Sequence, residues 1–196
     1  FESPNLLSDM STKDKILASL FSSVTARTAG FNTIDTASLT SSSKLLTVAL
    51  MFIGGSPGST AGGMKTTTLA VLTATAVSVF RRNENPELFK RRIAPETVAN
   101  AASILMMYLS LCLTGAFLIS RIEDLPMMAC VFETASAVGT VGLSFGITPG
   151  LGSISRIILI ILMYLGRVGG LTLIYAALSG HRIRFGKYPL EKITVG

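Results

Sequence analysis

Apolar residues along this chain fall into runs of two different lengths. The run at 97–120 is uninterrupted and long enough to cross a hydrocarbon core of about 30 Å, since a helix rises about 1.5 Å per residue. A second long run predicts a helix over 154–180. Two other runs, at about 13–26 and 126–138, are too short to cross, so we expect re-entrant half-helices there.

Glycine-rich segments follow these runs. The apolar stretch 43–80 is interrupted at 54–65 by the sequence GGSPGSTAGGMK. Glycine and proline end regular structure, so this pattern predicts two helical halves joined by an irregular loop at membrane depth. Irregular segments at 27–33 and 139–146 likewise follow the two half-helices.

The composition is typical of a membrane protein. Charged residues make up 14% of the chain and the mean hydropathy is +0.58, whereas soluble domains carry about 25% charged residues. Cys112 and Cys130 lie in apolar runs without metal-ligand spacing, so we expect both to be buried small residues. The fold class predicted is an all-α integral membrane protein.

The net charge of +6 is concentrated in two segments. Residues 81–92 hold five Lys/Arg against two Glu, and residues 181–196 hold four against one. Basic loops stay in the cytoplasm. We therefore expect both segments to be cytoplasmic and 1–15 and 121–126 to be extracellular, in a multi-pass protein. Such localised charge does not indicate nucleic-acid binding.

Two parts of the chain repeat one pattern: a half-helix, a T-x-G tripeptide and a longer helix. The glycines of the tripeptides and the longer helices are both offset by 112 residues. Glycine permits the positive φ that turns carbonyls inward to replace an ion's water shell, and the partly negative end of the half-helix favours a cation. A packed glycine turn would explain one copy, but two copies favour an ion filter. The candidate filter residues are Thr28, Ala29, Gly30, Phe31, Thr140, Val141, Gly142 and Leu143.

The segment 54–65 is the candidate gate. It does not have the spacing of a phosphate-binding loop, because Met64 precedes the lysine, and it follows an apolar helix rather than a strand. Its small residues would let the backbone approach a pore axis, and its hydroxyls would reach an ion or its water. A plain helix kink is the alternative. The candidate gate residues here are Gly54, Gly55, Ser56, Pro57, Gly58, Ser59, Thr60, Ala61, Gly62, Gly63 and Lys65.

Arg167 joins the candidate gate because it lies near the centre of the helix predicted over 154–180, about 20 Å from either end. An arginine at the centre of a membrane helix costs roughly 2.5–3.5 kcal/mol even on the most lenient scale. We therefore expect it to face protein, water or the conduction path, where its charge would raise the barrier to cations. The alternative is a structural pair with Glu133.

With these residues in view, the chain resembles the C-terminal half of a Trk/Ktr/HKT superfamily potassium transporter, closest to the Ktr membrane subunit. The matching sequences are TARTAGFNT at 25–33, GGSPGSTAGGMKTTT at 54–68, SAVGTVGLS at 136–144 and LGRVGG at 165–170. The resemblance implies four parallel repeats of membrane helix, pore helix, filter and membrane helix around one pore, with filter glycines at Gly30 and Gly142.

The resemblance also divides the chain. The implied parts are a third pore repeat lacking its first helix (1–80), a cytoplasmic loop (81–96), a fourth pore repeat (97–180) and a cytoplasmic tail (181–196). The first residue is Phe, so we expect a longer protein of which this is one part.

Further expectations concern ligands and partners. The resemblance implies potassium at the filter carbonyls, no other metal and no organic cofactor in this chain, with ATP or ADP only on a regulatory partner. The implied partners are the N-terminal half of the same transporter, a second copy in a homodimer, a cytosolic nucleotide-binding ring and membrane lipid, in a bacterial plasma membrane. No catalytic constellation is present in the sequence, so we expect no enzyme.

Three alternatives remain open. The cation could be sodium or a mixture of monovalent cations. A secondary carrier for a small solute would also use broken helices, although its repeats would be inverted, whereas the charge pattern here predicts parallel ones. A non-transporting subunit or split fragment would conduct only after assembly with a partner.

Overall fold

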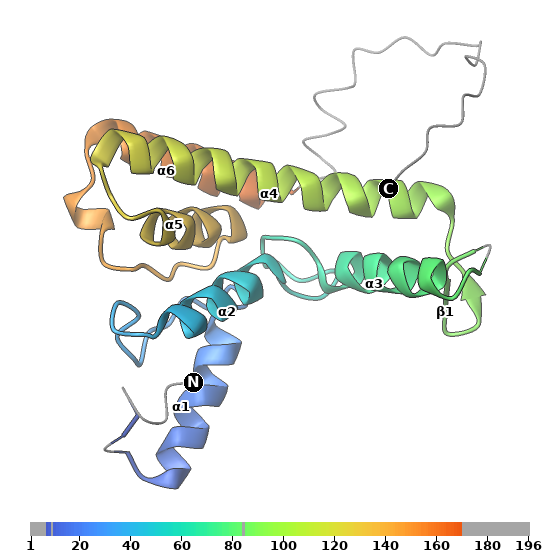
Figure 1. Cartoon of the computed structure of the whole chain (residues 1–196), viewed down its shortest axis with the longest axis horizontal. Helices are drawn as coiled ribbons and strands as arrows, with labels where there is room; N and C mark the ends of the chain where they lie inside the picture. The colour runs from blue at the N-terminus through green and yellow to red at the C-terminus, as the bar shows by residue number, and fades with distance from the viewer. Residues whose placement is uncertain (1–6, 9, 84, 170–196) are drawn as a thin grey trace.

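The computed structural model describes residues 7–8, 10–83 and 85–169, and it is mostly helical (Figure 1). The elements of the described residues, in chain order, are α1 (Thr12–Thr25), α2 (Ser41–Phe52), α3 (Thr66–Phe80), β1 (Glu87–Leu88), β2 (Arg91–Arg92), α4 (Pro95–Glu123), α5 (Met127–Gly139), η1 (Thr148–Gly150) and α6 (Ser153–Val168).

The helices α4, α5 and α6 form the most tightly packed part of the molecule (Figure 1). Helix α5 is buried along most of its length, with Phe132 and Val138 fully inaccessible. Gly166 of α6 lies directly against the carbonyl oxygen of Val138, where a larger side chain has no room. The hydroxyl of Tyr108 in α4 donates to the carbonyl of the same Gly166 at 3.2 Å. These contacts join α6 to both α5 and α4.

Helix α1 projects from this packed part and is far less covered (Figure 1). Only Thr25, at its end, is buried. Its exposed apolar side chains are Ile16, Leu17, Leu20, Phe21 and Val24. Such a surface normally packs on protein or lipid.

Most helix boundaries agree with the sequence expectations. The predicted half-helices 13–26 and 126–138 correspond to α1 and α5, and the break at 54–65 separates α2 from α3. Helix α4 extends the predicted 97–120 by a few residues at both ends.

The predicted loop 81–96 includes the hairpin of β1 and β2, between α3 and α4. One expected boundary is wrong. Helix α6 does not run from 154 to 180: it ends at Val168, because Gly169 has a φ of 89°, which a right-handed helix cannot continue. The rest of that prediction, and the tail 181–196, lie outside the described residues.

Among the described residues, α4 is the one helix with the length and hydropathy to cross a bilayer. At about 1.5 Å per residue, its 29 residues span about 43 Å. Helices α2, α3 and α5 are apolar but shorter. The multi-pass arrangement therefore remains a prediction.

Candidate functional site

The two T-x-G segments, which lie far apart in the sequence, meet in the structure. Gly30 packs so closely on the carbonyl oxygen of Val141 that a Cβ added at Gly30 would overlap this oxygen. A Cβ added at Gly142 would lie 3.6 Å from the Gly30 Cα, an ordinary contact. Both glycines are left-handed, with φ of 75° at Gly30 and 90° at Gly142. Gly30 is therefore required by its backbone conformation and by lack of space.

The threonine of each tripeptide is left-handed as well, with φ of 67° at Thr28 and 52° at Thr140. A β-branched residue rarely adopts this conformation, and residues in such sparsely populated regions cost of order 1–3 kcal/mol and cluster at functional sites. In the first segment, the Thr25 hydroxyl donates to the carbonyl of Phe31 at 2.5 Å. A carbonyl oxygen has two lone pairs, so this bond still leaves one acceptor site at Phe31.

The segment 54–65 reaches the second of these turns. Gly62 lies against the side chain of Thr140, again with no room for a Cβ, and a Cβ at Gly63 would lie 3.4 Å from the carbonyl oxygen of Gly139. The hydroxyl of Thr140 is buried and has no hydrogen-bond partner among the described residues. Buried polar atoms without hydrogen-bond partners are rare in folded proteins. The contact between the two segments is therefore unusual, because it buries a hydroxyl group without a partner among the described residues.

Lys65 holds the loop together from within. Its Nζ donates to the carbonyl oxygens of Ser59, at 3.1 Å, and Ala61, at 2.6 Å. At the base of the loop, the Gly54 N–H donates to the Met64 carbonyl at 2.7 Å. The loop is therefore a closed, internally bonded unit.

The hydroxyl groups of the loop are exposed, and their contact with an ion or its water stays a prediction. Ser56, Ser59 and Thr60 are exposed, and the loop residues packed on the second T-x-G turn are Gly62 and Gly63. The structure thus brings backbone, rather than hydroxyl side chains, to this turn.

Glu133 has a structural role that the sequence did not predict. It is buried, with 5% of its surface exposed. Its Oε1 accepts from the Ser144 hydroxyl at 2.6 Å and the Phe145 N–H at 2.8 Å, and its Oε2 accepts from the Thr148 hydroxyl at 3.0 Å. The expected alternative, a pair with Arg167, is not found: among the described residues no ion pair joins the two side chains, and Arg167 is exposed. A carboxylate inside an apolar half-helix was the available signal.

A second set of contacts joins the two halves just beyond the turns. The Thr36 hydroxyl donates to the Ser144 carbonyl at 2.5 Å. The ring of Phe145 packs edge-on against Phe132, with centroids 5.8 Å apart, and the Nζ of Lys44 lies 4.4 Å from the Phe145 centroid. The residues after the second turn are therefore held by both halves of the chain.

Arg167 is exposed and lies in the last turn of α6 rather than at a helix midpoint. No hydrogen bond among the described residues joins it to the segment 54–65. Its role in a gate stays a prediction.

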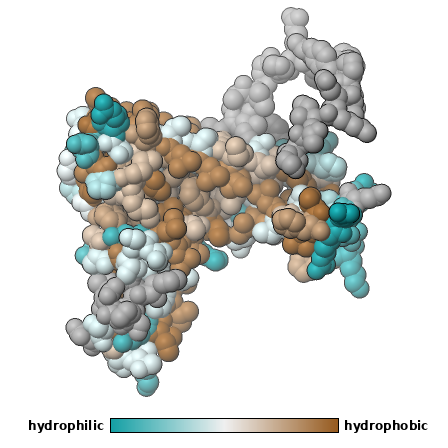
Figure 2. Space-filling view, in the orientation of Figure 1, coloured by the Kyte–Doolittle hydropathy of each residue, from teal (hydrophilic) through white to brown (hydrophobic). Residues whose placement is uncertain are grey.

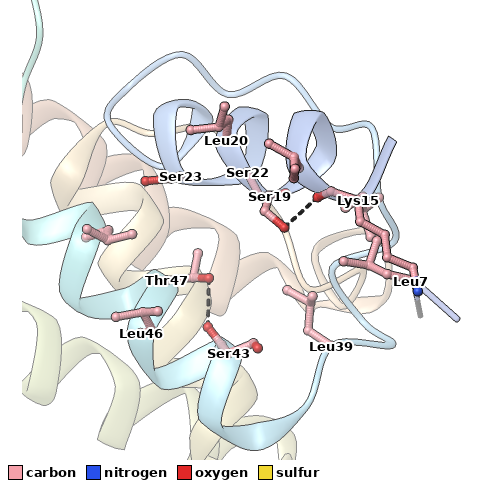
Figure 3. Close-up of a pocket in the computed structure, with 13 residues that line it drawn as sticks. Leu7, Lys15, Ser19, Leu20, Ser22, Ser23, Leu39, Ser43, Leu46 and Thr47 are labelled. Atoms are coloured by element: carbon pink, nitrogen blue, oxygen red, sulfur yellow. Dashed lines mark hydrogen bonds between the residues drawn. The ribbon is translucent and has the colours of Figure 1, made fainter. Parts of the chain in front are cut away.

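A hollow of about 580 Å³ separates α1 from α2 (Figure 3). Ser19 and Leu20 of α1 line one side, and Leu46 and Thr47 of α2 line the other. The corresponding flank of the second half is covered, because α4 packs against both α5 and α6. The first half thus has an uncovered flank where the second has a helix.

Comparison with known proteins identifies relatives over nearly the whole chain. Residues 3–182 match the family TrkH, described as a cation transport protein. The chain is 39% identical over 189 residues to the potassium/sodium uptake protein NtpJ of Enterococcus hirae, covering 93% of this chain and 42% of that protein. It is 36% identical over 196 residues to the Ktr system potassium uptake protein B of Bacillus subtilis, covering 100% and 44%.

A solved structure has the same fold. The crystal structure of the potassium transporter TrkH from Vibrio parahaemolyticus aligns with a TM-score of 0.73 at 22% identity, over 89% of this chain and 39% of that one. The chain therefore spans less than half the length of these relatives.

Proposed function

Because the chain belongs to the TrkH family of cation transport proteins, we propose that it forms part of a pore that carries potassium ions across the membrane. The observation that carries this proposal is the meeting of two left-handed T-x-G turns, with Gly30 packed on the Val141 carbonyl. Carbonyl oxygens at such turns can replace the water shell of an ion. The chain is then a transporter component and not an enzyme.

In this proposal the eight filter residues, 28–31 and 140–143, supply two of the segments that surround the ion. The unpartnered hydroxyl of Thr140 supports an ion or its water beside the second turn, because either would satisfy this buried oxygen. The ions enter here as cargo, and the chain needs no organic cofactor.

We assign the gate to the loop 54–65. Its support is the packing of Gly62 on the side chain of Thr140, a residue of the second T-x-G turn. Deleting 56–63 in the complete transporter should raise rubidium flux into proteoliposomes, because this obstruction is gone. Arg167→Ala should do the same if its charge faces the conduction path. Unchanged flux in both variants, at equal protein levels, would overturn the gate.

The remaining parts of the pore must come from partners. The hollow between α1 and α2 and the exposed apolar side chains of α1 support a covering helix from the N-terminal half of the transporter. We further propose a homodimer, a cytosolic ring that binds ATP or ADP, and a bacterial plasma membrane with 81–92 and 181–196 on the cytoplasmic side.

Potassium uptake is tested in cells that lack their own potassium transporters. The complete transporter should restore growth at low potassium, and its Gly30→Ala variant should not. Growth restored equally by both would show that the two turns do not form the conducting path. A purified protein that takes up an organic solute, without any cation current, would favour the secondary carrier instead.

Sodium is the second candidate cargo. The Enterococcus hirae relative is named a potassium/sodium uptake protein, so a mixed filter is a specific alternative. Competition of sodium against rubidium uptake decides between them: inhibition at equal concentrations supports a mixed filter, and inhibition only at large excess supports potassium.

A further inference from the structure

The connection between α3 and α4 is an ordered hairpin, called the basic hairpin below (residues 81–92). Its strands pair Glu87 with Arg92 and Leu88 with Arg91. Phe89 and Lys90 form its tip, with φ of 50° and 61°, the conformation of a tight two-residue turn. The basic hairpin is therefore a folded unit with a defined surface.

The basic hairpin folds back on α3 rather than away from it. The Ser78 hydroxyl of α3 donates to the Asn85 carbonyl at 3.0 Å. A hollow of about 460 Å³ lies between the two, lined from Thr73 on the helix to Lys90 on the hairpin. Thr73 precedes the end of α3 at Phe80 by about 10 Å along the helix axis. The hairpin thus lies beside the last two turns of an apolar helix.

Positive charge is concentrated on this unit. Five cationic side chains are exposed: Arg81, Arg82, Lys90, Arg91 and Arg92. None of them forms a salt bridge with a carboxylate of the described residues, although Glu87 is the pairing partner of Arg92. Figure 2 shows the resulting hydrophilic patch at the end of the molecule where α3 and the hairpin meet.

Large apolar side chains stand beside these cations. Phe89 at the tip is 91% exposed and Phe80 at the end of α3 is 86% exposed, while Val79 is 67% exposed. Aromatic rings next to Lys and Arg are the combination found where a protein meets the headgroup layer of a membrane. A contact with water alone would leave these rings unfavourably hydrated.

We propose that the basic hairpin binds the headgroups of anionic phospholipids in the leaflet where α3 ends and α4 begins. The five cations contact lipid phosphates, and Phe80 and Phe89 insert among the lipids. The hollow between the hairpin and α3 has mixed walls, with Arg81 and Lys90 beside Glu87 and apolar residues of both elements, so the phosphate contacts are assigned to the exposed face of the hairpin. This interaction does not depend on which cation the pore carries.

The placement favours lipid over a protein partner. A hairpin that docks a soluble protein would extend away from the apolar helices, whereas this one folds back along the apolar helix α3. Clusters of four to eight Lys/Arg next to a membrane helix are typical of anionic-lipid binding.

The test uses the complete transporter in lipid nanodiscs. The chain has no tryptophan, so Phe89→Trp introduces a reporter at the tip that keeps an aromatic ring there. Its fluorescence is taken as the difference from the parent protein. Brominated phosphatidylglycerol, mixed into phosphatidylcholine, should quench this signal more strongly than brominated phosphatidylcholine at the same fraction.

Charge variants of the Phe89→Trp protein measure how much the cations contribute to the preference for phosphatidylglycerol. Each Lys or Arg at an anionic surface contributes about a fivefold preference, so K90Q/R91Q/R92Q should lower the phosphatidylglycerol preference by up to about a hundredfold. R91K/R92K keeps the charge and should retain it. K13Q/K15Q, on α1, is the matched control and should change nothing at the hairpin.

Two results would overturn the proposal. Equal quenching by the two brominated lipids means that the hairpin has no charge preference. Quenching by neither lipid places the tip in water or against a protein. If the triple variant fails to assemble, the comparison of the two brominated lipids in the parent reporter still decides.

Discussion

Replacing Gly30 by alanine separates the two physical reasons for a glycine at the meeting point of the turns. The change imposes a side chain on a left-handed residue, and it also drives a Cβ into the carbonyl oxygen of Val141. Two other glycines share only part of this situation. Gly142 is left-handed with an ordinary neighbour at 3.6 Å, and Gly146 is left-handed, with φ of 89°, in open space.

The magnitudes follow from these differences. A left-handed L-residue costs roughly 1–2 kcal/mol, which is the whole cost expected for Gly146→Ala and most of that for Gly142→Ala. Overpacking against a neighbour that cannot rotate away adds about 1–3 kcal/mol. Since the neighbour of Gly30 is backbone, Gly30→Ala should lose about 2–5 kcal/mol or displace the second turn.

The assay measures rubidium uptake into proteoliposomes together with the thermal midpoint of the purified transporter. We expect Gly146→Ala to keep most of the flux, Gly142→Ala to lose part of it, and Gly30→Ala to lose nearly all. Gly58→Ala, left-handed and open in the loop, controls for strain outside the turns. Equal flux in Gly30→Ala and Gly146→Ala would refute the reasoning, because it would mean that the Val141 contact has no part in conduction.

Two further changes test the surroundings of the turns. Glu133→Gln keeps the shape of the side chain but weakens three charge-assisted hydrogen bonds. We expect it to lower the free energy of unfolding by about 1–3 kcal/mol, measured by denaturation in detergent. A denaturation midpoint equal to that of the wild type would contradict this expectation. Lys65→Met removes the donor that holds the carbonyls of Ser59 and Ala61, so the loop should loosen and flux should rise. Lys13→Met, at an exposed lysine of α1, is the control, and an equal rise in both would rule out a specific effect.

The lengths of the apolar runs predicted most of the helices, because the limits of these helices depend on the local sequence pattern. The boundaries of α1 and α5 follow from apolar runs that stop at a T-x-G tripeptide, and the break between α2 and α3 follows from glycine and proline. These features act within a few residues, so no knowledge of distant contacts was needed.

Other features depend on contacts that no local pattern reports. The packing of Gly30 on Val141 joins segments more than one hundred residues apart. The partners of Glu133 lie 11 to 15 residues away in an irregular segment, where spacing has no fixed geometry. The strands of the basic hairpin have two residues each, too few to show alternation. The sequence does not predict that α6 ends before Gly169, because glycine is tolerated inside other helices. The end follows from the left-handed conformation of this glycine.

The two copies of the repeated unit differ where the chain leaves the second helix of each. Gly54 and Gly166 occupy equivalent positions, 112 residues apart. Gly166 packs on the carbonyl of Val138, within its own half. Gly54 packs on the carbonyl of Gly62, and Gly62 in turn packs on Thr140 of the other half. The glycine-rich loop of the first copy thus packs on the T-x-G turn of the second, so we expect substitutions in the two turns to have different effects.

Thr140→Val tests this difference, because it removes the buried hydroxyl while keeping the shape of the side chain. If the hydroxyl simply lacks a partner, valine should stabilise the protein, since an unsatisfied buried group costs about 1–3 kcal/mol. If the hydroxyl holds a cation or its water, as the proposed function requires, valine should lower rubidium flux. The matched variant Thr28→Val makes the same change in the other turn. Higher stability with unchanged flux in Thr140→Val would show that the buried hydroxyl takes no part in conduction, whereas reduced flux that exceeds the effect of Thr28→Val would place an ion site at the contact between turn and loop.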